Sequence, residues 1–188
     1  MLERRLEPVE RVLASGEKLL WSGQPPTGLR LRASDALLIP FSIVWCGFAI
    51  FWETNVVKSG APFFFRLWGI PFIVVGLYLV FGRFFVDAII RKKTFYGVSS
   101  ERVIIVTGLF AKRVKSINLT TLGETSLTEK GDGTGTIVFG PIMPMGQWML
   151  GGSWPGAGRY APPAFEMIER VKEVYDLIRQ TQKPVPRP

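Results

Sequence analysis

The sequence predicts a membrane α+β protein, in which a two-helix transmembrane hairpin carries a small antiparallel β domain capped by a C-terminal helix. Three observations predict this fold class. Two long stretches are almost free of charge, although 20% of the 188 residues are charged. Beyond Thr94 the sequence changes to short runs rich in β-branched residues, which are typical of strands. Residues 163–182 then carry apolar side chains at spacings of three and four, which are typical of a helix.

Residues 1–33 are predicted to form an N-terminal cytoplasmic segment rather than a signal peptide. They lack a long apolar core and carry acidic residues early. Leu2, Leu6, Val9 and Leu13 would share one face of a short helix ending near residue 16. Such a helix would lie either on the membrane surface or on the cytoplasmic domain, and we expect the second arrangement.

The hairpin is predicted over residues 34–86. Its first helix, 36–52, would span about 25 Å, and its second, 62–82, would span about 31 Å. Both lengths are close to what a bilayer requires. The short polar connection Glu53–Ala61 makes the two helices antiparallel.

The distribution of basic residues predicts the orientation of this hairpin. Of the 23 Lys and Arg residues, six lie within residues 1–35 and 15 lie from Arg83 onward. The connection holds only Lys58, and Arg66 lies near the start of the second apolar block, from which its side chain would reach the far interface. Since basic residues collect on the cytoplasmic side, both termini are predicted to be cytoplasmic.

Arg83, Asp87 and Arg91 recur every four residues where the second helix would leave the bilayer. They are expected to line one solvated helix face, on which Asp87 would pair with either arginine. Lys92 and Lys93 follow directly and would mark the cytoplasmic boundary, where they would also contact anionic headgroups.

The β domain is predicted over residues 87–162, its C-terminal helix over 163–182 and a flexible tail over 183–188. About five strands are expected, because β-branched or alternating runs are separated by turn-like residues. These strands are Phe95–Val98, Arg102–Thr107, Arg113–Leu119, Ser126–Glu129 and Thr136–Phe139.

The segment Tyr96–Gly108 resembles the opening hairpin of bacterial pleckstrin-homology-like (PH-like) domains. An aromatic residue, a turn, an acid–Arg pair, an aliphatic strand and a glycine recur there. Residues 116–119 and 133–137 are also similar to that family, as is the segment Gly16–Pro25 ahead of the two helices. The resemblance implies a PH-like β-barrel or sandwich with a capping helix. Its first hairpin loop, 99–102, has one base beside one acid, where phosphoinositide-binding PH domains place several bases.

The residue inventory argues against catalysis. Without histidine, no His-based metal site, triad or proton shuttle can form. The single cysteine, Cys46, lies inside an apolar block, where it is interpreted as a small inert side chain. The run Gly131–Gly135 lacks the Lys-Ser/Thr ending of a phosphate loop. We therefore expect no enzyme, no cofactor, no metal site and no nucleic-acid partner, since topology accounts for most of the +8 formal charge.

One candidate binding surface lies in the Gly- and Pro-rich segment 140–163, which also carries large adaptable apolar side chains. Two interpretations stay open. These side chains would either dock a partner or close the open end of the barrel beneath the last helix. The candidate residues are Met145, Trp148, Met149 and Trp154.

These patterns together predict a non-catalytic protein of the bacterial inner membrane. Its cytoplasmic domain would bind another protein, so that the chain would serve as an accessory subunit of a larger membrane complex. The alternative is a membrane-surface module that binds anionic lipid. The candidate headgroup contacts are then Arg91, Lys92, Lys93, Lys112, Arg113 and Lys115.

Overall fold

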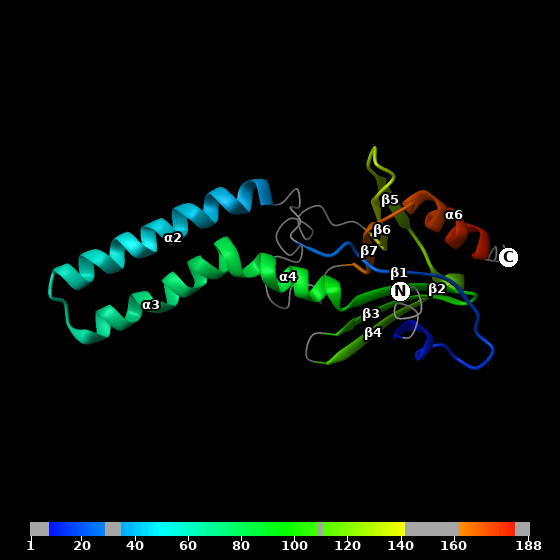
Figure 1. Cartoon of the computed structure of the whole chain (residues 1–188), viewed down its shortest axis with the longest axis horizontal. Coiled ribbons are helices and arrows are strands. Elements are labelled where there is room, and N and C mark those ends of the chain that lie inside the picture. The colour runs from blue at the N-terminus through cyan, green and yellow to red at the C-terminus, as the bar shows by residue number, and fades with distance from the viewer. Residues whose placement is uncertain (1–7, 29–34, 109–110, 142–161, 183–188) are drawn as a thin grey trace.

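The computed structural model describes residues 8–28, 35–108, 111–141 and 162–182. A long helical hairpin extends away from a domain that consists of two small antiparallel sheets and a C-terminal helix (Figure 1). The coarse α+β prediction is therefore confirmed. The candidate partner surface at Met145, Trp148, Met149 and Trp154 lies outside the described residues.

The hairpin consists of α2 (Asp35–Lys58) and of α3 (Phe63–Leu77), which continues through the π-helical turn η1 (Tyr78–Gly82) into α4 (Arg83–Lys92). Both α2 and the continuous helix Phe63–Lys92 are long and apolar enough to cross a membrane.

The predicted connection Glu53–Ala61 is wrong, because α2 continues to Lys58. Two polar side chains in this region support the helix instead of ending it. Thr54 Oγ1 donates to the carbonyl of Ile50 at 2.6 Å, and Asn55 Nδ2 donates to that of Phe51 at 2.7 Å. Polar composition alone had indicated a loop, whereas these residues satisfy their hydrogen bonds within the helix.

The two long helices approach each other closely where small residues meet. A Cβ added at Gly76 would lie 3.0 Å from the Cα and Cβ atoms of Cys46 on α2. Cys46 is only 7% exposed. Most other apolar side chains of the hairpin face outward, including Val44 at 72% and Phe63 at 77% exposure. The contact between the helices is therefore narrow, and their remaining surface is available to lipid or to other helices.

This close contact predicts a cross-link. With Gly76→Cys, the new Cβ would need to move only slightly to reach the 3.5–4.5 Å Cβ–Cβ separation of a disulfide from Cys46. We expect mild iodine oxidation of the full chain to remove both free thiols, as measured by alkylation and mass spectrometry. Val75→Cys, whose position is 36% exposed, is the control and should keep both thiols. Equal oxidation of the two variants would contradict the packing.

Sheet A has the strand order β1 (Leu19–Gly23), β2 (Thr94–Ser99), β3 (Arg102–Gly108) and β4 (Lys112–Asn118). Sheet B has the order β5 (Thr125–Glu129), β6 (Gly135–Phe139) and β7 (Ala164–Ile168). Every pairing is antiparallel. The five strands expected from the sequence correspond to β2–β6, whereas β1 comes from the N-terminal segment and β7 from the segment expected to be helical.

The prediction of one helix over residues 163–182 is wrong, because β7 precedes α6 (Val171–Thr181). Phe165 and Ile168 are apolar and three residues apart, which suggested a helical face, and the structure buries both of them. In the structure, both side chains are buried from an irregular strand and not from a helix. Met167 has a φ of 52° and Arg170 a φ of 50°, so the strand is irregular and the chain turns before α6 begins.

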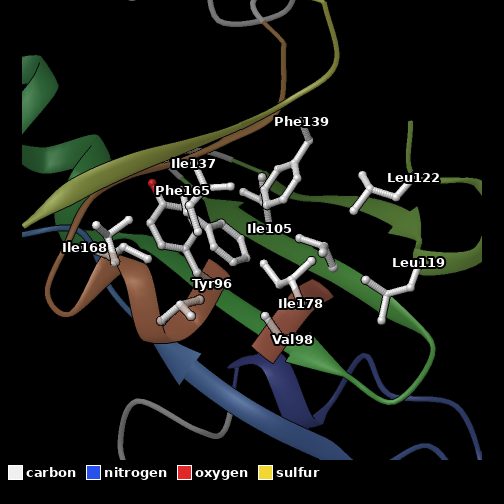
Figure 2. Close-up of a cluster of buried hydrophobic side chains, with 13 residues drawn as sticks. Tyr96, Val98, Ile105, Leu119, Leu122, Ile137, Phe139, Phe165, Ile168 and Ile178 are labelled. Atoms are coloured by element: carbon white, nitrogen blue, oxygen red, sulfur yellow. The ribbon is translucent and has the colours of Figure 1, made fainter. Parts of the chain in front are cut away.

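The central strands β2 and β3 of sheet A are packed on both of their faces. On one face, Tyr96, Val98 and Ile105 join residues of sheet B and α6 in the main core. Figure 2 shows these side chains converging between the sheets. On the other face, Val9 packs against Ile104 and Val106 and is fully buried. The N-terminal segment is therefore part of the domain, covering one sheet face and adding strand β1.

Candidate functional site

The face formed by Arg83, Asp87 and Arg91 is not solvated as expected. Arg83 is 5% exposed and its Nη1 lies 3.1 Å from Asp35 Oδ1, so the pair joins the start of α4 to the start of α2. Arg91 is 4% exposed. Its Nη2 lies 2.7 Å from Asp87 Oδ2 and donates to the carbonyl of Gly28 at 3.2 Å. Burial therefore removes Arg91 from the candidate headgroup contacts.

The basic strand β4 divides its side chains between two faces of sheet A. Successive residues of a strand point to opposite faces, and directly paired residues share a face. Lys112 pairs with Gly108, and so lies on the side of Val106 and the N-terminal segment. Arg113 pairs with Thr107 and Lys115 with Ile105, which belongs to the main core side. The sequence grouped these three bases, and the sheet separates Lys112 from the other two.

Lys112 instead lines an open hollow of about 320 Å³, together with bases from two other segments. The hollow lies at the end of sheet A where the chain passes from α4 into β2. Lys92 and Lys93 come from the end of α4, and Arg11 comes from the N-terminal segment. The apolar part of the lining is formed by Pro8, Phe95, Val106 and Gly108. Among the described residues, every charged side chain lining the hollow is basic.

Neighbouring contacts fix the position of these bases. The buried side chain of Val9 holds the N-terminal turn on the sheet, and Arg11 follows two residues later on the exposed side. The backbone N–H of Gly108 donates to the carbonyl of Lys93 at 3.1 Å, which ties the end of β3 to the end of α4. Because the framework is packed, the four bases are held near one another before any ligand arrives. Lys92 and Lys112 add positive charge to this end of the domain, whereas Arg11 and Lys93 each interact with a further group.

A second polar cluster joins the N-terminal segment to the β2–β3 turn. The carboxylate of Glu17 accepts from Arg102 Nε at 2.9 Å and from Arg102 Nη2 at 2.8 Å. It also accepts from the backbone N–H of Ala14 at 2.7 Å and from the hydroxyl of Ser99. The side chain of Glu17 is fully buried, so this cluster is structural in character rather than an accessible site.

The pKa of Glu17 follows from this geometry. The hydrogen bonds from Arg102 lower it from 4.5 to about 2, although burial opposes the shift. The same contact raises the pKa of the Arg102 guanidinium. The sequence identified Arg102 in an acid–Arg pair with its neighbour Glu101. The pairing with Glu17, 85 residues away, emerges only from the fold.

The described residues contain no group of three or more Cys, Asp or Glu side chains placed to hold a metal ion. Comparison of the chain with known families, curated proteins and solved structures gives no match. Among the described residues, the basic hollow is the candidate site that brings Lys92, Lys93, Lys112 and Arg11 to one space. Sequence reasoning identified Lys92, Lys93 and Lys112 but missed Arg11, which carries no local signal of its role.

Proposed function

We propose that the chain is a non-catalytic membrane protein of the bacterial inner membrane, with both termini in the cytoplasm, whose PH-like domain lies on anionic lipid. The observation that carries this proposal is the position of the basic hollow at the end of the domain that joins α4. The continuous helix Phe63–Lys92 has 30 residues, or about 45 Å of length. About 30 Å of it would cross the hydrocarbon, so α4 would emerge into the headgroup layer.

The PH-like assignment within this proposal is supported by the arrangement of the motifs. The segment that resembles the opening PH-like hairpin forms β2 and β3, and the similar segment 133–137 opens β6. The C-terminal helix α6 packs on the main core through Val171, Val174 and Ile178. These features agree with a small β domain capped by one helix.

The orientation of the domain also supports contact with lipid. Lys92 and Lys93 end α4, while the hollow opens beside them and includes Lys112. A basic residue near an anionic leaflet contributes about 1 kcal/mol of attraction. Several such residues at one end would therefore hold the domain against the membrane, and this attraction would weaken with salt.

Hydrogen exchange of the full chain in lipid nanodiscs tests this proposal. We expect residues 111–118 to exchange more slowly in nanodiscs with anionic lipid than in neutral ones, and high salt should remove the difference. Replacing Lys92 and Lys112 together by glutamate should reduce this added protection by about fivefold for each lysine that is lost. The reason is that each base contributes about 1 kcal/mol of attraction.

The matched control is Lys172→Glu, an exposed position on α6, which Figure 1 places at the end of the domain away from the hairpin. It makes the same Lys-to-Glu change at one position, so it is compared with Lys112→Glu alone, and it should leave the lipid-dependent protection intact. Protection that does not depend on anionic lipid, or that falls equally in the control, would refute a surface-bound domain.

The protein-binding function stays a second candidate, favoured by the free edge of sheet A. Among the described strands, β4 has a paired neighbour on one side only, and Val114 on it is 38% exposed. A partner strand could pair with such an edge. The bases on β4 would suit an acidic partner and also discourage non-specific pairing. Recovery of a stoichiometric membrane partner in mild detergent would favour the accessory-subunit role.

A further inference from the structure

Among the described strands, β4 has a neighbour on one side only, and the register identifies which backbone groups face its open edge. The backbone N–H of Leu119 donates to the carbonyl of Glu101 at 2.8 Å, which continues the β3–β4 ladder by one pair. Hydrogen-bonded and non-hydrogen-bonded pairs alternate along an antiparallel ladder. Arg113, Lys115 and Ile117 therefore direct their backbone N–H and carbonyl groups toward β3.

The backbone groups of Lys112, Val114 and Ser116 face this open edge. The β2–β3 ladder supports the same assignment independently. The N–H of Gly108 donates to the carbonyl of Lys93 at 3.1 Å, so Gly108 directs its backbone to β2 and its β4 partner Lys112 directs its own outward. All three β4 residues are exposed, and β4 borders sheet A in Figure 1. An extended segment can therefore add beside β4 by main-chain hydrogen bonds.

The side chains of β4 determine which added strand fits. Arg113 and Lys115 share one face of the sheet, and Val114 lies between them on the other face. Neither base has an acidic residue across the ladder, because their partners on β3 are Thr107 and Ile105. Opposite charges directly across a ladder stabilise the pairing, whereas like charges destabilise it. A fitting strand therefore has acidic residues opposite Arg113 and Lys115, and between them an apolar residue that covers the exposed side chain of Val114.

A second copy of β4 does not meet these requirements. In an antiparallel pairing of two copies, Val114 of one strand would lie opposite Lys112, Val114 or Ser116 of the other, since these residues face the edge. The three registers place Arg113 opposite Arg113, Arg113 opposite Lys115, and Lys115 opposite Lys115, respectively. Each register therefore brings like charges directly across the ladder, which destabilises it. The charge of β4 disfavours self-pairing and favours an acidic partner.

We propose that β4 binds an extended acidic segment of a partner protein as an antiparallel fifth strand of sheet A, an inference that rests on the protein-binding candidate above and not on contact of the domain with lipid. In this segment, acidic residues flank an apolar one. The acidic side chains pair with Arg113 and Lys115, and the backbone of the segment bonds to Lys112, Val114 and Ser116.

Hydrogen exchange of the full chain in a non-ionic detergent, resolved to single amides, tests the proposal. The probe is a short peptide that alternates glutamate with valine, and the control peptide has the same composition with its glutamates grouped at one end. We expect the alternating peptide to slow exchange at Val114 and Ser116 by about tenfold or more. Exchange at Arg113 and Lys115 should change little, because these amides already bond to β3. The grouped peptide should protect neither set.

Two variants separate the contribution of the backbone from that of the charge. Val114→Pro removes one outward N–H, which an edge strand tolerates, and should weaken binding of the alternating peptide by about tenfold. Arg113→Glu places a like charge opposite the peptide and should also weaken its binding by about tenfold. The matched control is Lys172→Glu on α6, an exposed position with the same change in charge, which should leave binding of the peptide unchanged. Unchanged exchange in β2 would show that the variants remain folded.

Equal protection of the Val114 and Arg113 amides, equal binding of the two peptides, or equal loss in Arg113→Glu and Lys172→Glu would overturn the edge site. Slow exchange at Val114 without peptide that is lost on dilution would assign the edge to a second copy and would also overturn the proposal. Failure of the protein-binding function gives a different result. A stoichiometric membrane partner that co-purifies equally with the wild type and both variants keeps that function but excludes β4, whereas recovery of no such partner counts against the function itself.

Discussion

Replacing Phe165 by alanine is expected to destabilise the β domain by about 3–5 kcal/mol, the usual cost of removing a fully buried phenylalanine side chain. Phe165 has no exposed surface. Its ring centroid lies 4.7 Å from that of Tyr96, 5.1 Å from that of Phe139 and 5.5 Å from that of Trp21. These partners belong to β2, β6 and β1, so one side chain from β7 links both sheets.

Hydrogen exchange of the full chain in detergent measures this effect. Protection of the β2 and β6 amides reports opening of the shared core, and 3 kcal/mol corresponds to more than a hundredfold faster exchange in these strands. Phe85→Ala is the control, since this side chain on α4 is 60% exposed. If the two variants exchange alike, Phe165 does not hold the two sheets together.

The sequence predicted β2–β6 because local signals in that region agree with one another. In β3, for example, Arg102–Gly108 combines a preceding turn with a run of β-branched residues, and the strand lies between two hydrogen-bonded neighbours with both of its faces packed. The strand β1 lacked such a signal. Its five residues acquire strand structure by pairing with β2, which is far away in the sequence.

The candidate site was predictable in composition but not in arrangement. Lys92, Lys93 and Lys112 were identified as exposed bases from their positions after a helix and in a strand. Whether a base lies in the hollow depends on register, which separates Lys112 from Arg113. Arg91 was grouped with its basic neighbours in the sequence. Helix periodicity places it beside Asp87, and it also donates a hydrogen bond to the carbonyl of Gly28, so that its side chain is buried.

The stability of the β domain is expected to depend on the ionisation of Glu17. Its pKa is lowered from 4.5 in the unfolded chain to about 2 in the folded domain, chiefly by the hydrogen bonds from Arg102. A carboxylate with a depressed folded-state pKa stabilises the fold fully above pH 4.5 and loses this contribution as the pH falls through about 2. The shift corresponds to about 3 kcal/mol.

Glu17→Gln isolates this contribution from that of the other acidic residues. At pH 7 the variant should be less stable than the wild type by about 3 kcal/mol, because Arg102 loses its charged partner. The difference should shrink as the pH falls from about 4.5 to about 2, where Glu17 itself becomes neutral. Urea unfolding of the full chain in detergent, followed by near-ultraviolet circular dichroism, gives both stability curves.

Glu173→Gln provides the matched control, because this carboxylate pairs with Arg170 at 3.3 Å but keeps 68% of its side chain exposed. An exposed pair contributes little, so the control should follow the wild-type curve at every pH. If the Glu17→Gln and wild-type curves instead run parallel down to pH 2, the Arg102 contact does not depress the pKa of Glu17.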